Sequence, residues 1–234
     1  MGRFCSVGVR CSTHWVCCYD LPLRSGPVCW EDVFVSGRPQ IVEYDPTWPD
    51  QFAVVAARVR AALTELAMSV EHIGSTAVPG LPAKDVIDVM AVVGTDADLG
   101  SAADALAGAG WSVRPPGMND HPVPGLPGDP QQWVKRFAGP PEGMRPVNLH
   151  LRIAGRANAR YALLFRDFLA AHPLTTASYA EAKRRLAALC DSTAQYAEAK
   201  DPICDLVYLP AEEWAESSGW QEPWKERPWA GQRR

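Results

Sequence analysis

The sequence has no apolar run near the roughly 20 residues that a transmembrane helix requires. Its first residues, MGRFCSVGVR, also lack the continuous apolar stretch of a signal peptide. Positive charge is not in excess, since 23 Lys and Arg stand against 27 Asp and Glu for a net charge of −4. A dedicated nucleic-acid binder needs surplus cations to displace counterions from phosphates. We therefore expect a cytoplasmic protein that binds neither membranes nor nucleic acids; a small phosphorylated ligand is compatible with this charge.

Cysteine is scarce beyond the first thirty residues. That segment holds five of the seven cysteines, together with His14: Cys5, Cys11, Cys17, Cys18 and Cys29. Structural zinc sites usually pair ligands two to four residues apart, whereas these cysteines are adjacent or separated by at least five residues. The segment also shows neither helical nor alternating periodicity. We expect residues 1–37 to be a poorly ordered extension that holds no zinc.

Regular strand and helix patterns begin in the sequence at Pro39. Alternating or buried apolar patterns predict strands, and apolar residues at three- and four-residue steps predict helices. The expected strands cover residues 69–74, 85–93, 111–114 and 145–155, and the expected helices cover 49–68, 96–110, 157–171, 176–191 and a segment from 202 onward. Residues 115–141, rich in Pro and Gly, are predicted to form a long and functional loop.

These elements predict a mixed α/β (α+β) fold, a mixed sheet flanked by helices with a helical C-terminal part. The folded domain is expected to cover residues 38–217. Residues 218–234 form a Trp- and Pro-rich tail with too little aliphatic content for a core of its own. Pro210 is expected to end or kink the last helix, with Asp201 as its N-cap.

A glycine-serine turn precedes a strand that carries one acid. Gly74 and Ser75 can bring backbone amides and a hydroxyl close to a phosphate, and Lys84 can add positive charge. Asp88 shares a strand face with Val86 and Met90, so its carboxylate either faces a cavity or is buried at high cost. A carboxylate near a phosphate-binding turn suits a magnesium-nucleotide site, although a lone strand aspartate can equally cap a nearby helix.

Several separated motifs carry a resemblance to a known family. They are VEYDPTWPDQF, HIGSTAVPGLPAKDVIDVMAVV, KRF at 135–137, NLHLR, FRDFL and YAEAK, in this order. The chain resembles the GrpB family between about Pro39 and Glu216, and that family looks like a branch of the nucleotidyltransferase superfold. The resemblance implies a mixed α/β core in which the Gly-Ser turn precedes the strand with the metal aspartate. Family members that are fused to a dephospho-coenzyme A kinase imply a link to coenzyme A biosynthesis enzymes.

The resemblance implies an enzyme that binds a nucleoside triphosphate with Mg²⁺ and transfers a nucleotidyl group to a small acceptor. A nucleotide-dependent ligase is a variant, and a non-catalytic module that binds a nucleotide or coenzyme A precursor is the alternative. The expected catalytic residues are Asp88, His150, Lys84 and Arg152, with Asp88 as the metal ligand; the expected nucleotide-binding residues are His72, Gly74, Ser75, Thr76, Arg136, Arg166, Lys183 and Lys200. His72, His150, Arg166 and Lys183 each have an ordinary structural explanation as well, in sheet packing or on a helix surface.

One departure from the superfold bears on mechanism. Its members typically place a second acid two residues after the first, where this chain has Met90. A third acid on a later strand is also missing if that strand is NLHLR, which carries Asn148, His150 and Arg152. Two metal ions need several shared oxygen ligands. We therefore expect one metal position at most, with a cluster of positive charge in place of the second.

Overall fold

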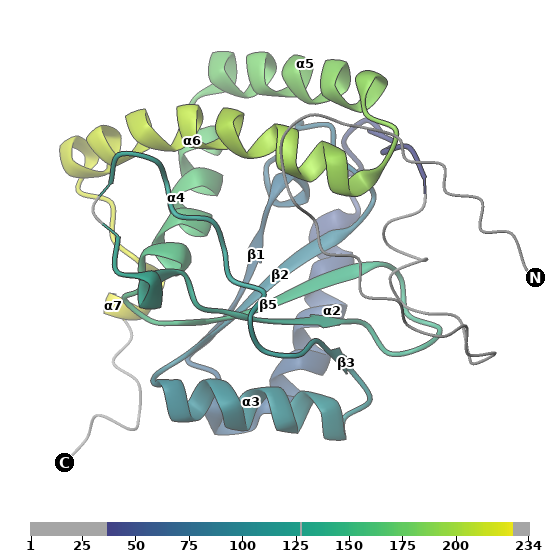
Figure 1. The fold of residues 1–234 in the computed structure, drawn as a ribbon, viewed down its shortest axis with the longest axis vertical. Coiled ribbons are helices and arrows are strands. Elements are labelled where there is room, and N and C mark those ends of the chain that lie inside the picture. The colour runs from purple at the N-terminus through teal and green to yellow at the C-terminus, as the bar shows by residue number, and fades with distance from the viewer. Residues whose placement is uncertain (1–36, 127, 227–234) are drawn as a thin grey trace, which may run out of the picture.

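The computed structural model describes residues 37–126 and 128–226. The prediction of a zinc-free extension over residues 1–37 falls almost wholly outside this part of the chain. Among the described residues, no helix has the combination of length and hydrophobicity that a membrane span needs. The architecture is mixed α/β, as predicted: one five-stranded sheet lies between two groups of helices (Figure 1).

The sheet has the order β1-β2-β5-β4-β3. Its strands are β1 (Ser69–Ile73), β2 (Ile87–Val93), β3 (Ser112–Val113), β4 (Arg136–Gly139) and β5 (Val147–Ile153). The central pair, β2 and β5, is parallel, and the other neighbours are antiparallel. The strands predicted for EHIGS, DVIDV and NLHLR are therefore direct neighbours. Their polar residues meet at one end of the sheet, where β2 and β5 begin and β1 ends.

One sheet face packs on α2 (Trp48–Leu63) and α3 (Asp96–Gly108). Alternation along β2 sends Val89 and Ala91 into this core, and β5 contributes Leu149 and Leu151. Thr95 caps α3 by accepting a hydrogen bond from the amide of Asp98. The alternate residues of the same strands, including Asp88, Asn148 and His150, must therefore face the other side.

The other face lies towards the C-terminal helices α4 (Ala157–Ala171), α5 (Pro173–Leu189) and α6 (Thr193–Ser218). Figure 1 shows α5 and α6 running above one end of the sheet, with α4 between them and the strands. Residues just beyond α6 also join this side: the Trp220 indole donates to Asp167, and Trp224 in α7 (Pro223–Glu226) packs near Ile73 and Met90. This part of the tryptophan-rich tail thus packs on the domain.

Two predicted elements differ from those observed. The loop predicted for 115–141 is shorter, because a 3₁₀ turn at Pro130–Trp133 and strand β4 occupy its second half. The last helix begins at Thr193, capped by Ser192, and continues through Pro202 and Pro210. Both prolines are exposed, so water can satisfy the carbonyl groups that lose an amide partner. The prediction that Asp201 is the N-cap and the prediction of a helix end at Pro210 are therefore wrong.

Candidate functional site

Asp88 is a lone acid in an apolar strand because its side chain faces a pocket. It is the second residue of β2 and is paired in register with Asn148 of β5, whose Nδ2 donates to Asp88 Oδ1 at 2.8 Å. Gly74 lies directly against this carboxylate, since a Cβ atom there would fall 2.3 Å from Asp88 Oδ2. The backbone of Gly74 has φ +69° and ψ −169°, a conformation that is essentially restricted to glycine. The glycine therefore makes room for the acid at the mouth of the strand pair.

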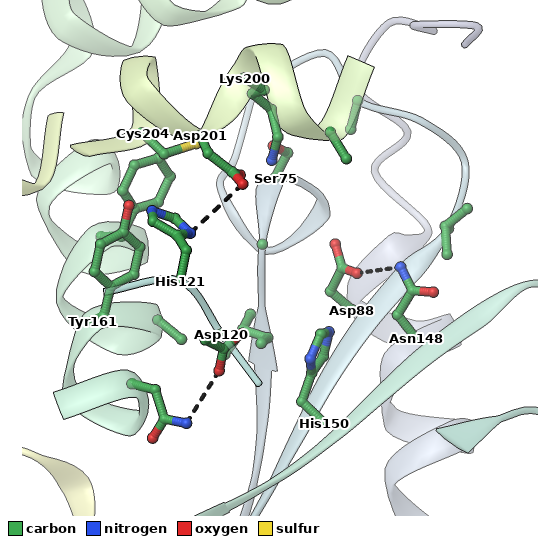
Figure 2. A pocket seen from close by; sticks show the side chains of 18 of the residues that line it. Ser75, Asp88, Asp120, His121, Asn148, His150, Tyr161, Lys200, Asp201 and Cys204 are labelled. Carbon is green, nitrogen blue, oxygen red and sulfur yellow. Dashed lines mark hydrogen bonds and ion pairs between the residues drawn. The ribbon is translucent and has the colours of Figure 1, made fainter. Parts of the chain in front are cut away.

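The pocket around Asp88 has a volume of about 380 Å³, which lies in the range of small-molecule sites. It opens between the ends of β1, β2 and β5, the loop that follows β3, and helices α4, α5 and α6 (Figure 2). Most residues predicted for the site line it: Gly74, Ser75, Thr76, Lys84, Asp88, His150, Arg152, Lys183 and Lys200. Asp88, Gly74, Ser75, Lys84 and His150 thus line one and the same cleft.

Three lysines give one end of the pocket its positive charge. Within the described chain, no carboxylate oxygen lies within 4.0 Å of the ammonium nitrogens of Lys84, Lys183 or Lys200. Lys183 is only 2% exposed, and its Nζ donates to Ser75 Oγ at 2.9 Å and to the carbonyl of Pro82. Burial and the nearby charge of Lys200 lower the pKa of Lys183 to about 7. Burial also lowers the pKa of Lys84. This end of the pocket is suited to an anion.

Asp120 neutralises the other two cations that line the pocket. It accepts hydrogen bonds from Lys135 Nζ at 2.6 Å and from Arg152 Nε and Nη2 at 2.9 and 3.1 Å, and Asn158 donates a further one. Burial alone would raise the pKa of Asp120, but the charges of Arg152 and Lys135 outweigh it and hold the pKa well below its usual range. Arg152, expected to be a catalytic residue, is thus already paired with a carboxylate.

His121, the next residue of the same loop, fastens the loop to α6. Its Nε2 lies 3.0 Å from Asp205 Oδ1, and its Nδ1 lies 3.6 Å from Asp201. The Tyr161 hydroxyl of α4 donates to the same oxygen of Asp205. Figure 2 shows His121 and Asp201 on the opposite side of the pocket from Asp88 and Asn148. The loop predicted from the Pro- and Gly-rich segment therefore contributes two polar residues, Asp120 and His121, to the wall of the pocket.

His150 lies between these two groups of residues (Figure 2). Its ring packs edge-on against Phe137, with ring centroids 5.2 Å apart, and among the described residues its buried Nδ1 has no hydrogen-bond partner. Burial and the positive charge of Arg152 keep the pKa of His150 well below 6.5. The imidazole is therefore neutral at pH 7 and can accept a proton or a hydrogen bond from a ligand.

Three predicted residues do not line the pocket, for reasons of strand register and burial. His72 is paired with Val89, so it faces α2, where its ring stacks on Phe52 at 4.6 Å. Burial lowers the pKa of His72 to about 4. Arg136 is paired with Leu151, so it also points to the sheet face that packs on α2 and α3, and it donates to the carbonyl of Arg114. Successive residues of a strand point to opposite faces of the sheet, and His72 and Arg136 point away from the pocket. In the KRF motif, Lys135 is the residue that lines the pocket.

Arg166 is the third of these residues. From α4 it donates to the backbone carbonyl of His72 at 2.9 Å and to Asp167 at 2.6 Å, with Glu71 3.6 Å away. It therefore ties the helix to the edge strand β1 and is already paired with protein carboxylates.

A sequence signal for the lysine end of the pocket lies in α5 and α6. The pentapeptide Tyr-Ala-Glu-Ala-Lys occurs twice, at 179–183 and 196–200. A spacing of four residues puts each tyrosine and lysine on one helix face, and all four of these side chains line the pocket. The repetition on two neighbouring helices identifies Tyr196 and Lys200 together with Tyr179 and Lys183. Asp120, His121 and Asn158 carry no comparable signal, since their roles depend on where the loop folds.

The residues of the pocket do not build a two-metal centre. Met90, at the position of the superfold's second acid, is fully buried, contacts Arg152 through its sulfur, and does not line the pocket. In the described part of the chain, no three His, Cys, Asp or Glu side chains are grouped as metal ligands. Asp88 alone, surrounded by lysines, is a poor donor set for a divalent cation without oxygens from a ligand.

The fold and the site together define a mixed α/β protein with a pocket of about 380 Å³ at the end of its central parallel strand pair. The family model described as GrpB protein matches residues 38–209. The chain therefore belongs to the GrpB family, as its motifs predicted.

Two curated relatives and one solved structure support this assignment. A protein named dephospho-CoA kinase from Mycolicibacterium paratuberculosis is 33% identical over 195 residues, with 78% of this chain and 48% of the relative covered. A UPF0157 protein from Deinococcus radiodurans is 35% identical over 161 residues, with 68% and 76% covered. The crystal structure of the conserved protein GrpB from Enterococcus faecalis is 26% identical with a TM-score of 0.60, covering 75% of this chain and 99% of that one. The chain thus spans about half the length of the kinase-named relative.

Proposed function

We propose that the pocket binds a nucleotide or a related phosphorylated small molecule, such as a coenzyme A precursor. The observation that carries this proposal is the set of three lysines, Lys84, Lys183 and Lys200, that have no carboxylate within ion-pair distance in the described chain. Unpaired cations in a partly buried cleft are costly unless a ligand supplies the opposite charge. In the Gly74–Thr76 turn, Ser75 adds a hydroxyl beside them.

The rest of the pocket suits the organic part of such a ligand. Aromatic side chains form the wall on the helical side: Trp133, Tyr161, Phe165, Tyr179 and Tyr196. Aromatic rings beside a few well-placed polar groups are the usual composition of a small-molecule site. The name dephospho-CoA kinase, carried by relatives that are about twice as long as the matched region, supports a link to nucleotide chemistry. We propose that a functional link to coenzyme A biosynthesis extends to this chain.

Nucleotidyl transfer to a small acceptor is the second candidate, and the neutral imidazole of His150 favours it. Its Nδ1, which has no hydrogen-bond partner among the described residues, can accept a proton from an acceptor hydroxyl or amine as that group attacks the α-phosphorus of a nucleoside triphosphate and pyrophosphate leaves. Asp88 would hold one Mg²⁺ together with oxygens of the bound phosphates. That ion would neutralise phosphate charge, and the pocket's own residues would bind and orient the two reactants.

The substitution Asp88→Asn separates these two candidates by the sign of its effect. If the pocket binds a nucleotide through its lysines alone, removing a negative charge among them strengthens ATP binding in chelator, by roughly threefold to tenfold. If Asp88 holds Mg²⁺ at the phosphates, the same change weakens binding in Mg²⁺ while leaving the fold intact. Titration calorimetry with ATP, with Mg²⁺ and with EDTA, measures both effects.

A thermal-shift screen of nucleotides tests the parent proposal. A ligand at a hundred times its Kd adds about 2.7 kcal/mol to the free energy of unfolding, a shift of several degrees. We expect ATP or another phosphorylated nucleotide to produce such a shift in EDTA. If no nucleotide, coenzyme A precursor or pyrophosphate stabilises the protein, with or without Mg²⁺, the proposed function is wrong.

A further inference from the structure

Two lysines of the pocket come from the repeated pentapeptide, and they face the same space from two helices. Lys183 projects from α5 and Lys200 from α6, and both line the pocket beside Ser75. Figure 2 shows Lys200 pointing from α6 towards Ser75, the residue that accepts a hydrogen bond from Lys183. The charge of Lys200 is close enough to lower the pKa of Lys183. The structure thus holds two like charges together near one hydroxyl.

Lys183 uses only two of its three N–H donors in hydrogen bonds to the described protein. A lysine ammonium has three N–H donors. Two donate to Ser75 Oγ and to the carbonyl of Pro82, both of them neutral acceptors. The ring of Tyr179 lies 5.0 Å from Nζ and offers its face to the charge, which fixes the amine without neutralising it. The protonated form of Lys183 therefore has a donor and a full charge left for a ligand.

We propose that Lys183 and Lys200 together make the pocket select a doubly charged phosphoryl group over a singly charged one. This inference rests on the proposed function and names the chemical class of ligand that the site takes. A phosphate monoester carries close to two negative charges above its second pKa, near 6, whereas a diester carries one. Lys183 and Lys200 form no ion pair with a carboxylate among the described residues, so their two charges match a monoester, whereas a diester would balance only one of them.

Binding of the doubly charged group should be accompanied by the uptake of a proton at Lys183. The charged groups facing Lys183 are Asp88 from β2, Lys200 from α6 and Arg184 from its own helix, with the Cys204 thiol of α6 and the Tyr179 hydroxyl also nearby. Because its pKa is about 7, Lys183 is largely neutral in the empty pocket at pH 8. A bound dianion favours the charged form, raises the pKa and draws a proton from solution. Affinity for the dianion therefore falls as the pH rises above 7.

The experiment compares adenosine 5′-monophosphate with its methyl phosphate ester, which differ by one charge at the phosphate. Titration calorimetry at pH 7 should show the wild-type protein binding the monoester roughly tenfold or more tightly. Titrations at pH 8 in two buffers of different ionisation enthalpy should show uptake of up to about one proton per monoester. Lys183→Met should abolish the uptake, and Lys200→Met should remove most of the preference.

Arg185→Met is the matched control. It removes one charge from the same helix, but its side chain is 77% exposed and pairs with Glu181, so neither preference nor proton uptake should change. Because Lys183→Met also removes a buried hydrogen bond to Ser75, circular dichroism must confirm its fold. The titrations of the wild type and of Lys200→Met test the inference even if Lys183→Met does not fold. Equal binding of the two ligands, or binding without proton uptake, would overturn this inference and leave the proposed function standing. If neither ligand binds, this inference fails, and the thermal-shift screen of nucleotides, coenzyme A precursors and pyrophosphate decides the proposed function.

Discussion

Replacing Asp120 with alanine is expected to cost roughly 3–5 kcal/mol of the free energy of unfolding, because it leaves two buried cations without a counter-charge. The side chains of Arg152 and Lys135 are only 8% and 13% exposed, and both hydrogen-bond to this carboxylate. Urea unfolding at pH 7 measures the change. The loop that carries Asp120 should also detach from β5, so ligand affinity should fall together with stability.

Asp191→Ala is the matched control for that experiment. Asp191 pairs with Arg38 at the surface, where the two side chains are 80% and 72% exposed. An ion pair in solvent contributes at most about 1 kcal/mol. If Asp120→Ala and Asp191→Ala destabilised the protein equally, the buried pairing of Asp120 would have no special role, and the account of the loop would be wrong.

Replacing Gly74 with alanine is the second large effect, and it acts on both backbone and pocket. The backbone conformation of Gly74 costs a non-glycine residue about 1–3 kcal/mol. The new Cβ would also lie 2.3 Å from Asp88 Oδ2 and 2.9 Å from Asp88 Cβ, so the strand or the turn must move. We expect a loss of roughly 2–4 kcal/mol in stability and loss of detectable nucleotide binding.

Gly80→Ala is the control that separates the backbone strain of a positive φ from the steric clash of a new Cβ with Asp88. Gly80 also has a positive φ, +77°, but a Cβ atom there would meet nothing within 4 Å. This variant should lose only the backbone contribution, about 1–2 kcal/mol, and should bind nucleotide as the wild type does. Nucleotide binding that survives in Gly74→Ala at wild-type affinity would contradict the role given to the Gly74–Asp88 contact.

Alternation and helical spacing were enough to predict four of the five strands and most helices. Valine and leucine at every second position of NLHLR and its neighbour fix which side chains enter the core, so Asp88 and His150 could be placed on one face in advance. Boundaries depended on less regular signals. Pro202 and Pro210 normally end helices, and their exposure on α6, which makes them tolerable, is a property of the folded protein.

The candidate site divides in the same way. Ser75, next to Gly74, and Lys183, in a motif that carries the family resemblance, were expected from the sequence, and both line the pocket. His72 and Arg136 were misplaced because a motif shows that a position matters without showing which sheet face it occupies, and the cross-strand pairing turns both away. Asp120 was missed because its partners come from β5, α4 and the end of its own loop. Such a network exists only after folding.

The most direct test of the central claim is calorimetric titration of ATP in EDTA into the wild-type protein and into the double variant Lys84→Met/Lys200→Met. If the unpaired lysines of the pocket bind phosphate, the double variant should lose roughly 100-fold or more in affinity, as expected for two charge-assisted contacts. Circular dichroism should show the same fold in both proteins. Equal ATP affinity in the wild type and the double variant, or no ATP binding by the wild type in either EDTA or Mg²⁺, would contradict the account.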